Sequence, residues 1–96
     1  MHAVIRTYSG KGAKELFDLL EVRKADIEIL MRPINGFVSY SLVRTDAGGV
    51  SVTVCRDKAG AEESVQRARD WIGRNGSDIG ASAPHVAEGP VILHLK

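Results

Sequence analysis

Two runs of alternating residues, rich in β-branched and aromatic side chains, lie on either side of a short polar segment in the middle of the chain. The runs are residues 36–45 and 50–56, and the segment between them is Asp46-Ala47-Gly48-Gly49. Such alternation is typical of β-strands, and the glycines allow the positive φ angles of a tight turn. The pattern predicts a β-hairpin at the centre of the fold.

The segment before the hairpin predicts one strand and one long helix. Residues 2–8 alternate as a strand does, with Val4, Arg6 and Tyr8 on one side. Residues 11–31 show the longest helical pattern, because apolar side chains recur at spacings of four and seven. A proline at position 33 ends this pattern, since the residue before a proline is pushed out of the helical region.

The segment after the hairpin repeats this order with the helix first. Asp57 is a suitable N-cap for a helix over residues 58–74, whose apolar residues form a single stripe. Residues 85–96 predict a last strand, interrupted at 88–90 by a bulge or an edge kink. The chain therefore shows the order β-α-β-β-α-β.

This order predicts an α+β fold of the ferredoxin-like class, with a single domain over residues 1–96. Four antiparallel strands would form one sheet, and the two helices would cover one of its faces. The sheet is expected to be apolar on its other face as well, because Val4, Cys55 and Ile92 alternate with apolar neighbours such as Ile5 and Val52. We therefore expect this face to pack against the same face of a second copy in a twofold homodimer. The alternation in the second strand does not decide which of its faces points to the helices.

Composition narrows the range of partners. The net charge is +1, with 13 basic and 12 acidic residues, so neither nucleic acid nor a membrane surface is a predicted partner. The single cysteine, Cys55, excludes an internal disulfide and is predicted to be a small buried side chain in a cytoplasmic protein. The three histidines, His2, His85 and His94, have no metal-ligand spacing, and no metal site is predicted.

From Gly36-Phe37 onward, the sequence resembles the antibiotic-biosynthesis-monooxygenase-like branch of the dimeric α/β-barrel superfamily. The resemblance rests on this glycine-aromatic opening with Tyr40, on the strand-to-helix step over 52–58, on the late Trp71 and on the proline-introduced strand over 84–91. It covers nearly the whole chain. It implies that two sheets close face to face into a barrel, which agrees with the apolar faces described above.

The resemblance implies several possible activities. The superfamily includes cofactor-independent oxygenases of polycyclic aromatics, haem-degrading enzymes, decarboxylases, isomerases and small proteins without known activity, and fold alone does not choose among them. The haem-degrading branch uses a histidine of the second helix as axial ligand, but residues 58–74 contain none. It also uses an asparagine on the first strand, where this chain has Arg6, Thr7 and Tyr8. No cofactor is therefore predicted.

The oxygenase branch implies a pocket of aromatic and amide side chains between helices and sheet, for which the candidates are Tyr40, Trp71, Asn35 and Tyr8. Each of the aromatic residues could equally serve packing, Trp71 at the margin of the core and Tyr40 at the dimer interface. Arg6 could pair with an anionic substrate, although a charge near a strand end is normally solvated.

Two functions therefore remain open. The first is a cofactor-independent monooxygenase or a binder of small aromatic compounds, and the second is a non-catalytic dimeric module with a structural or interaction role. A cavity of a few hundred Å³ beneath Tyr40 and Trp71 would favour the first, and a filled core would favour the second.

Overall fold

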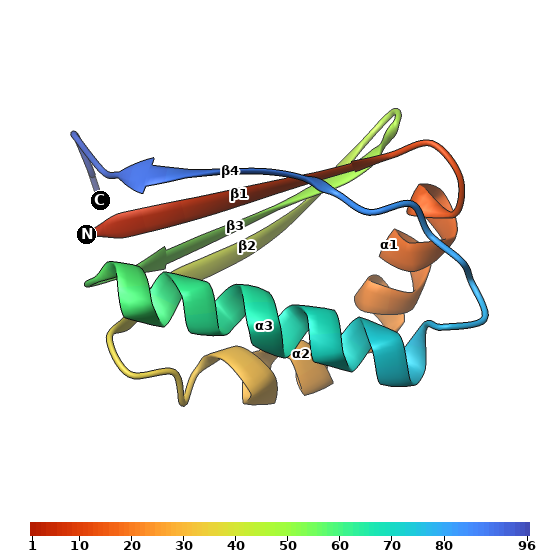
Figure 1. Cartoon of the computed structure of the whole chain (residues 1–96), viewed down its shortest axis with the longest axis horizontal. Coiled ribbons are helices and arrows are strands. Elements are labelled where there is room, and N and C mark those ends of the chain that lie inside the picture. Colours follow the sequence, from red (N-terminus) through yellow and green to blue (C-terminus); the bar gives the residue numbers. More distant parts are fainter.

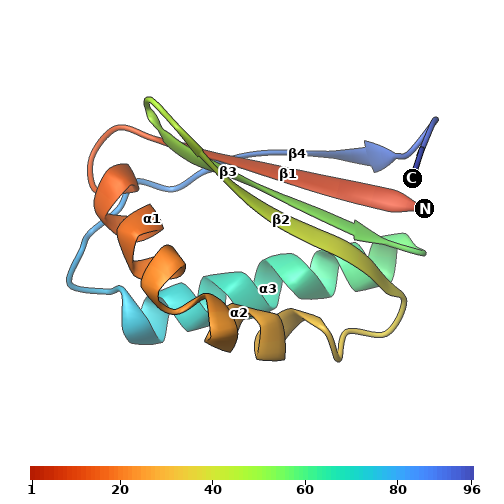
Figure 2. The same ribbon diagram turned by 180° about the vertical axis from the view of Figure 1, so that it is seen from behind.

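The computed structural model describes residues 1–96 and contains one antiparallel sheet covered by helices on one face (Figures 1 and 2). The sheet has the strand order β2-β3-β1-β4. The chain runs through β1 (His2–Ser9), α1 (Ala13–Val22), α2 (Lys24–Met31), β2 (Phe37–Thr45), β3 (Gly48–Cys55), α3 (Lys58–Asn75) and β4 (His85–Pro90). This is the ferredoxin-like βαββαβ arrangement that the sequence predicts.

The first helical segment is broken into two helices, where the sequence predicts one. The break lies at Arg23, whose φ of −103° and ψ of 23° are not helical. Its side chain is held by Asp26, three residues on, and its guanidinium lies 5.5 Å from the centre of the Trp71 ring. Because the chain changes direction at Arg23, the apolar stripes of α1 and α2 can both face the twisted sheet (Figure 2).

The hairpin has a shorter turn than the sequence predicts. The turn consists of Asp46 and Ala47 alone, because Thr45 already pairs with Gly48. Gly48 and Gly49 belong to β3, where they let α1 approach the sheet closely. A Cβ atom at Gly49 would overlap the Phe17 ring, and one at Gly48 would press on the Ala13 side chain. These glycines therefore serve helix–sheet packing.

The last strand is shorter than predicted and ends at Pro90. Pro90 pairs with His2 at the beginning of β1, and only one more backbone hydrogen bond, from Val91 N–H to the Met1 carbonyl, follows it. A proline also has no N–H group to donate. Residues 91–96 are not in a strand, and Ile92 and Leu93 are largely exposed. The predicted contribution of Ile92 to a sheet face is therefore wrong.

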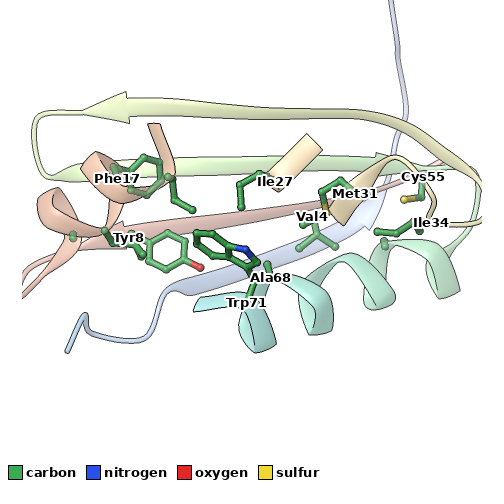
Figure 3. Packing of buried hydrophobic residues seen from close by; sticks show 13 residues of the cluster. Val4, Tyr8, Phe17, Ile27, Met31, Ile34, Cys55, Ala68 and Trp71 are labelled. Atoms are coloured by element: carbon green, nitrogen blue, oxygen red, sulfur yellow. The ribbon is translucent and has the colours of Figure 1, made fainter. Parts of the chain in front are cut away.

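The core lies between the sheet and the helices (Figure 3). Cys55 is fully buried in it, as predicted, together with Val4 of β1. The structure also decides the orientation of β2, because Tyr40 and Leu42 pair with the buried Thr53 and Ser51 on the helix side. The remaining members of the core are Tyr8, Ala13, Leu16, Phe17, Leu20, Ile27, Met31, Ile34, Ala61, Ala68 and Trp71.

The helix-free face of the sheet has an apolar centre, as the sequence predicts, although Thr7, Ser39 and Ser41 also lie on this face. Across this face Ile5 pairs with Val52 at the centre, and Val43 of β2 pairs with Val50. Val43 is 50% exposed, and Val50 and Val52 beside it are partly exposed.

None of the three helices combines the length and the apolar character needed to cross a membrane.

The close approach of α1 to β3 predicts a strong effect of one added methyl group. Gly49→Ala should lower the free energy of unfolding by about 1–3 kcal/mol, because the Phe17 ring would have to leave its position. Urea unfolding followed by circular dichroism measures this change. Gly73→Ala is the matched control, since nothing lies within 4 Å of its added Cβ. In the α3 helix this change should stabilise by roughly 0.5–1 kcal/mol. Equal effects of the two changes would contradict the packing described.

Candidate functional site

Polar side chains gather at the centre of the helix-covered face of the sheet, where an apolar core is expected. Arg6, Ser51 and Thr53 are at most 3% exposed. Arg6 pairs with Ser51 across β1 and β3, and Thr53 pairs with Tyr40 of β2. With Tyr8, which lies two residues after Arg6 on the same side of β1, these residues form what we call the polar cluster.

Arg6 forms the centre of the polar cluster. Its Nη1 donates to the hydroxyl of Tyr8 at 3.1 Å, and its Nη2 donates to the hydroxyl of Tyr40 at 3.4 Å. Its guanidinium also lies 5.8 Å from the centre of the Tyr8 ring. No carboxylate forms an ion pair with it, although Arg23, Arg32, Arg44 and Arg67 all have one. The expectation of a solvated charge at Arg6 is therefore wrong.

Three buried polar atoms of the cluster have no hydrogen-bond partner. They are Arg6 Nε, Ser51 Oγ and Thr53 Oγ1. The Ser51 hydroxyl lies near that of Tyr40 but outside hydrogen-bond geometry. Buried polar atoms are nearly always paired in folded proteins, and an unpaired one costs about 1–3 kcal/mol. Unpaired polar groups in one place indicate a site that a ligand or solvent completes.

Both phenols of the cluster are neutral at physiological pH. Burial raises the pKa of the Tyr8 hydroxyl, and the charges of Arg6 and Arg69 only partly oppose this. Burial likewise raises the pKa of Tyr40, against the opposing charge of Arg6. The positive charge of Arg6 is thus not neutralised by a tyrosinate. Because each phenol oxygen accepts a bond from Arg6, its O–H remains available as a donor to a ligand.

Two clefts flank the polar cluster. The first, which we call the α2 cleft, measures about 310 Å³ and separates α2 from β2. Its walls are largely apolar and aromatic, and Tyr40 is the only lining residue with a hydroxyl group. Charged side chains stand along α2. Its lining residues are Lys24, Ile27, Glu28, Met31, Arg32, Phe37, Tyr40 and Leu42.

The second cleft, which we call the α3 cleft, measures about 370 Å³. It is bordered by Arg6 and Tyr8 of β1, by Arg69 and Ile72 of α3, and by the segment 81–84 that leads to β4. None of its lining residues is acidic. Between the two clefts lies a narrow void of about 10 Å³ beside Arg6, Tyr8, Tyr40 and Trp71, which is about the volume that one water molecule needs.

The structure brings three of the four predicted site residues together. Tyr8, Tyr40 and Trp71 surround the narrow void, and Figure 3 shows the hydroxyl of Tyr8 directed toward Trp71. Trp71 is buried and packs beneath Arg23. Asn35 lies apart from them: it is exposed in the connection from α2 to β2, near Gly60, and lines neither cleft.

The residues that sequence reasoning missed are Ser51, Thr53 and Arg69, and it misjudged the burial of Arg6. The sequence did contain one indication that Arg6 is buried. It alternates with Val4 and Tyr8 on a single side of β1, and that side is buried. Ser51 and Thr53 likewise alternate with Cys55. Arg69 carries no such signal, since it is one of several charged residues on an exposed helix face.

No protein-family model matches the sequence, and no curated protein matches it. Solved structures match it over its whole length. The haem-degrading protein MhuD of Mycobacterium tuberculosis, with two haems bound in its active site, has a TM-score of 0.69 and 17% identity, with 100% of both chains covered. A monooxygenase from ActVA-Orf6 of Streptomyces coelicolor, in complex with nanaomycin D, has a TM-score of 0.63 and 17% identity, covering 99% of this chain and 90% of that one. NE2512 of Nitrosomonas europaea, a protein of unknown function, has a TM-score of 0.69 and 14% identity, covering 99% and 91%.

These likenesses show that the chain has the ferredoxin-like fold of the antibiotic-biosynthesis-monooxygenase-like proteins, as the resemblance in the sequence predicts. At such low identity they show the fold alone. What the chain does with this fold depends on the residues of its own clefts.

The burial of both phenols predicts their titration behaviour. Tyr8 and Tyr40 are the only tyrosines, so the ultraviolet absorbance of tyrosinate reports on the cluster alone. In the native protein both should ionise above the ordinary value of 10.0, and in guanidinium chloride they should ionise near it. Because the folded pKa values are raised, this contribution to stability is present below pH 10 and is lost as the pH rises further. Tyr40→Phe leaves Tyr8 as the single reporter. A native phenol that titrates below pH 10 would contradict this account.

Proposed function

We propose that the protein binds a small aromatic compound in the α2 cleft and oxygenates it without a cofactor. The cleft offers the flat side of a ligand the aromatic ring of Phe37 and the aliphatic side chains of Ile27 and Leu42. Its volume of about 310 Å³ is within the range of small-molecule sites. The likeness to a monooxygenase bound to nanaomycin D supports a ligand of this class.

The observation that carries the proposal is the placement of Tyr40. Tyr40 forms part of the cleft wall, and its hydroxyl accepts a hydrogen bond from Arg6, which lies outside the lining of this cleft. This bond orients the hydroxyl and leaves its proton free to be donated to an oxygen atom of the ligand. Arg6, which orients this hydroxyl, is itself buried, and a purely structural core would gain nothing from a buried arginine.

The residues of the cleft suit a reaction in which the substrate supplies the reactivity. No histidine or cysteine lines the cleft, and its only carboxylate is Glu28 on α2. An aromatic compound with an acidic methylene group can form a carbanion that reacts directly with dioxygen. One oxygen atom then becomes a quinone carbonyl, and the other leaves as water with the two hydrogens of the methylene group. The protein would orient the ring and exclude water.

A haem held by histidine or by a cysteine thiolate does not fit the residues of this chain. Haem iron is held by an axial ligand, most often histidine or a cysteine thiolate. None of the three histidines lines either cleft, and Cys55 is fully buried away from both. The likeness to MhuD is therefore one of fold, and we propose no haem chemistry for this protein.

A second candidate function is a non-catalytic dimeric module. The apolar helix-free face favours it, as does the narrowness of the void beneath Trp71 and Tyr40, where the cavity of an enzyme was expected. The dimer itself is compatible with both functions.

We propose that Ile5, Val52 and their neighbours pack against the same face of a second copy. Burial of apolar surface contributes about 25 cal/mol of free energy for each Å², and this contribution is lost if these side chains stay in water. A cytoplasmic location stays a prediction from the sequence.

The oxygenase proposal predicts activity toward dithranol, a tricyclic hydroxyanthrone that oxidises slowly in air. The protein should accelerate dioxygen uptake and the formation of the coloured quinone, measured with an oxygen electrode and by absorbance. Tyr40→Phe should slow the reaction about tenfold, because one hydrogen bond to the reacting oxygen is lost.

Val22→Ala is the control for this experiment, since Val22 is exposed on α1 and lines neither cleft. No acceleration over buffer would exclude the oxygenase, and binding of dithranol could then still be followed through the fluorescence of Trp71, the only tryptophan. An unchanged rate in a double variant, Tyr40→Phe with Trp71→Phe, would show that neither Tyr40 in the cleft nor Trp71 beside the narrow void takes part in the reaction.

The dimer proposal predicts a mass of two chains in sedimentation at micromolar concentration. Val52→Lys places a charge at the centre of the helix-free face and should give a monomer with an unchanged far-ultraviolet circular dichroism spectrum. Val22→Lys introduces the same charge on the exposed side of α1 and should remain a dimer. A monomeric wild-type protein would contradict the proposal.

A further inference from the structure

We propose that the α3 cleft is a second binding site, which takes a small organic anion: a carboxylate or a phenolate carried on an apolar body. The proposal goes beyond the aromatic site of the α2 cleft, and the cleft that it concerns has a different lining. It depends on Arg6, Arg69 and the apolar walls of the α3 cleft, none of which lines the α2 cleft.

The charges around the α3 cleft are all of one sign. Arg6 lies in its wall at 3% exposure, and Arg69 reaches it from α3. Neither arginine forms an ion pair, whereas Arg67 on the same helix is paired with Glu63 at 2.8 Å. Since no acidic residue lines the cleft, two guanidinium groups face it without a counter-ion. An anion that enters the cleft would form the first ion pair of Arg6, which has none within the chain.

The geometry of Arg6 leaves donors free for such an anion. A guanidinium has five N–H groups, and Arg6 uses two of them, both toward tyrosine hydroxyls. Its Nε has no partner either, although this atom is buried and the structure does not open it to the cleft. The planar arrangement of the remaining donors matches the two oxygens of a carboxylate, which Arg commonly binds through two parallel hydrogen bonds. The hydroxyl of Tyr8, which also lines the cleft, can donate a further bond.

The cost of keeping Arg6 buried supports a role in binding. A buried charge without a partner is strongly unfavourable, and replacing buried ionic groups by apolar ones of similar volume often stabilises a protein. The two phenols of Tyr8 and Tyr40 are neutral and only partly compensate the charge of Arg6. A guanidinium at this place is therefore explained by a negative partner that is not part of the fold.

The remaining walls define the rest of the ligand. Leu16, Val65, Ile72 and Val86 give the cleft an apolar lining, so a bare inorganic ion would leave most of the 370 Å³ unused. An anionic group attached to a flat hydrocarbon body would satisfy the arginines and fill the cleft together. This combination selects an aromatic acid over both a neutral aromatic compound and a free phosphate ion.

The test compares 1-naphthoate with 1-naphthamide, which have the same shape and differ in charge. In isothermal titration calorimetry 1-naphthoate should bind at least tenfold more tightly, because its hydrogen bonds to Arg6 are charge-assisted. In a nitrogen–proton correlation spectrum the Nε–H signal of Arg6 should shift with 1-naphthoate and stay in place with 1-naphthamide or inorganic phosphate. Equal affinities, or an Arg6 signal that does not move, would overturn the proposal.

Variants separate binding from structure. Arg6→Met should abolish the preference for 1-naphthoate while leaving the urea midpoint equal or higher, whereas an arginine that only supports the fold would give a lower midpoint and an unchanged preference. Arg69→Met, at an exposed position, should weaken 1-naphthoate severalfold even if Arg6→Met does not fold. Arg74→Met is the control, because Arg74 is exposed on α3 and lines neither cleft. Retention of the full preference in Arg69→Met, or an equal loss in Arg74→Met, would contradict the assignment.

Dithranol oxidation in the α2 cleft, tested through Tyr40→Phe, can fail or succeed independently of this result.

Discussion

The helices cover only one face of the sheet, and each of the two faces has a polarity opposite to the one expected from this cover. The covered face, where an apolar surface would be the simplest solution, carries Arg6, Ser51 and Thr53 at its centre. The open face, where polar residues would be the simplest solution, carries Ile5, Val52 and other apolar side chains. This inversion is unfavourable for an isolated chain on both faces. It becomes reasonable if a second copy covers the open face and a ligand completes the covered one.

The two clefts divide the covered face between two kinds of chemistry. Both border the polar cluster, and Arg6 connects them because it donates to Tyr40 on one side and to Tyr8 on the other. One side is aromatic with a single hydroxyl, and the other is cationic with no acid near it. Proteins that share this fold carry out different reactions, and the placement of such side chains on a common scaffold is what distinguishes them.

The order of elements could be predicted from the sequence because it depends on periodicity, which each segment carries in itself. The break at Arg23 could not, since the apolar spacing of seven between Leu20 and Ile27 suits a continuous helix and a broken one equally well. The end of β4 depends on where its partner β1 begins, which is a property of the register. Arg6 shows the same difference. Its side of β1 followed from alternation, but its burial, its lack of a carboxylate partner and its position beside Arg69 arise only when β1, β2 and α3 come together.

The glycine pair in β3 has a consequence for the register of the sheet. If β3 slipped by one residue against β1, Val50 would take the place of Gly49 and its side chain would occupy the space of the Phe17 ring. Such a slip would also turn every side chain of the strand to the opposite face, with Ser51 and Thr53 toward the open side. A side chain at either glycine position would collide with α1, so alignments shifted by one residue are disfavoured. The Phe17 ring also packs edge-on against the ring of Tyr8, with 5.7 Å between the two ring centres. One side chain of α1 therefore contributes both to the alignment of the strands and to the position of the phenol that accepts a hydrogen bond from Arg6.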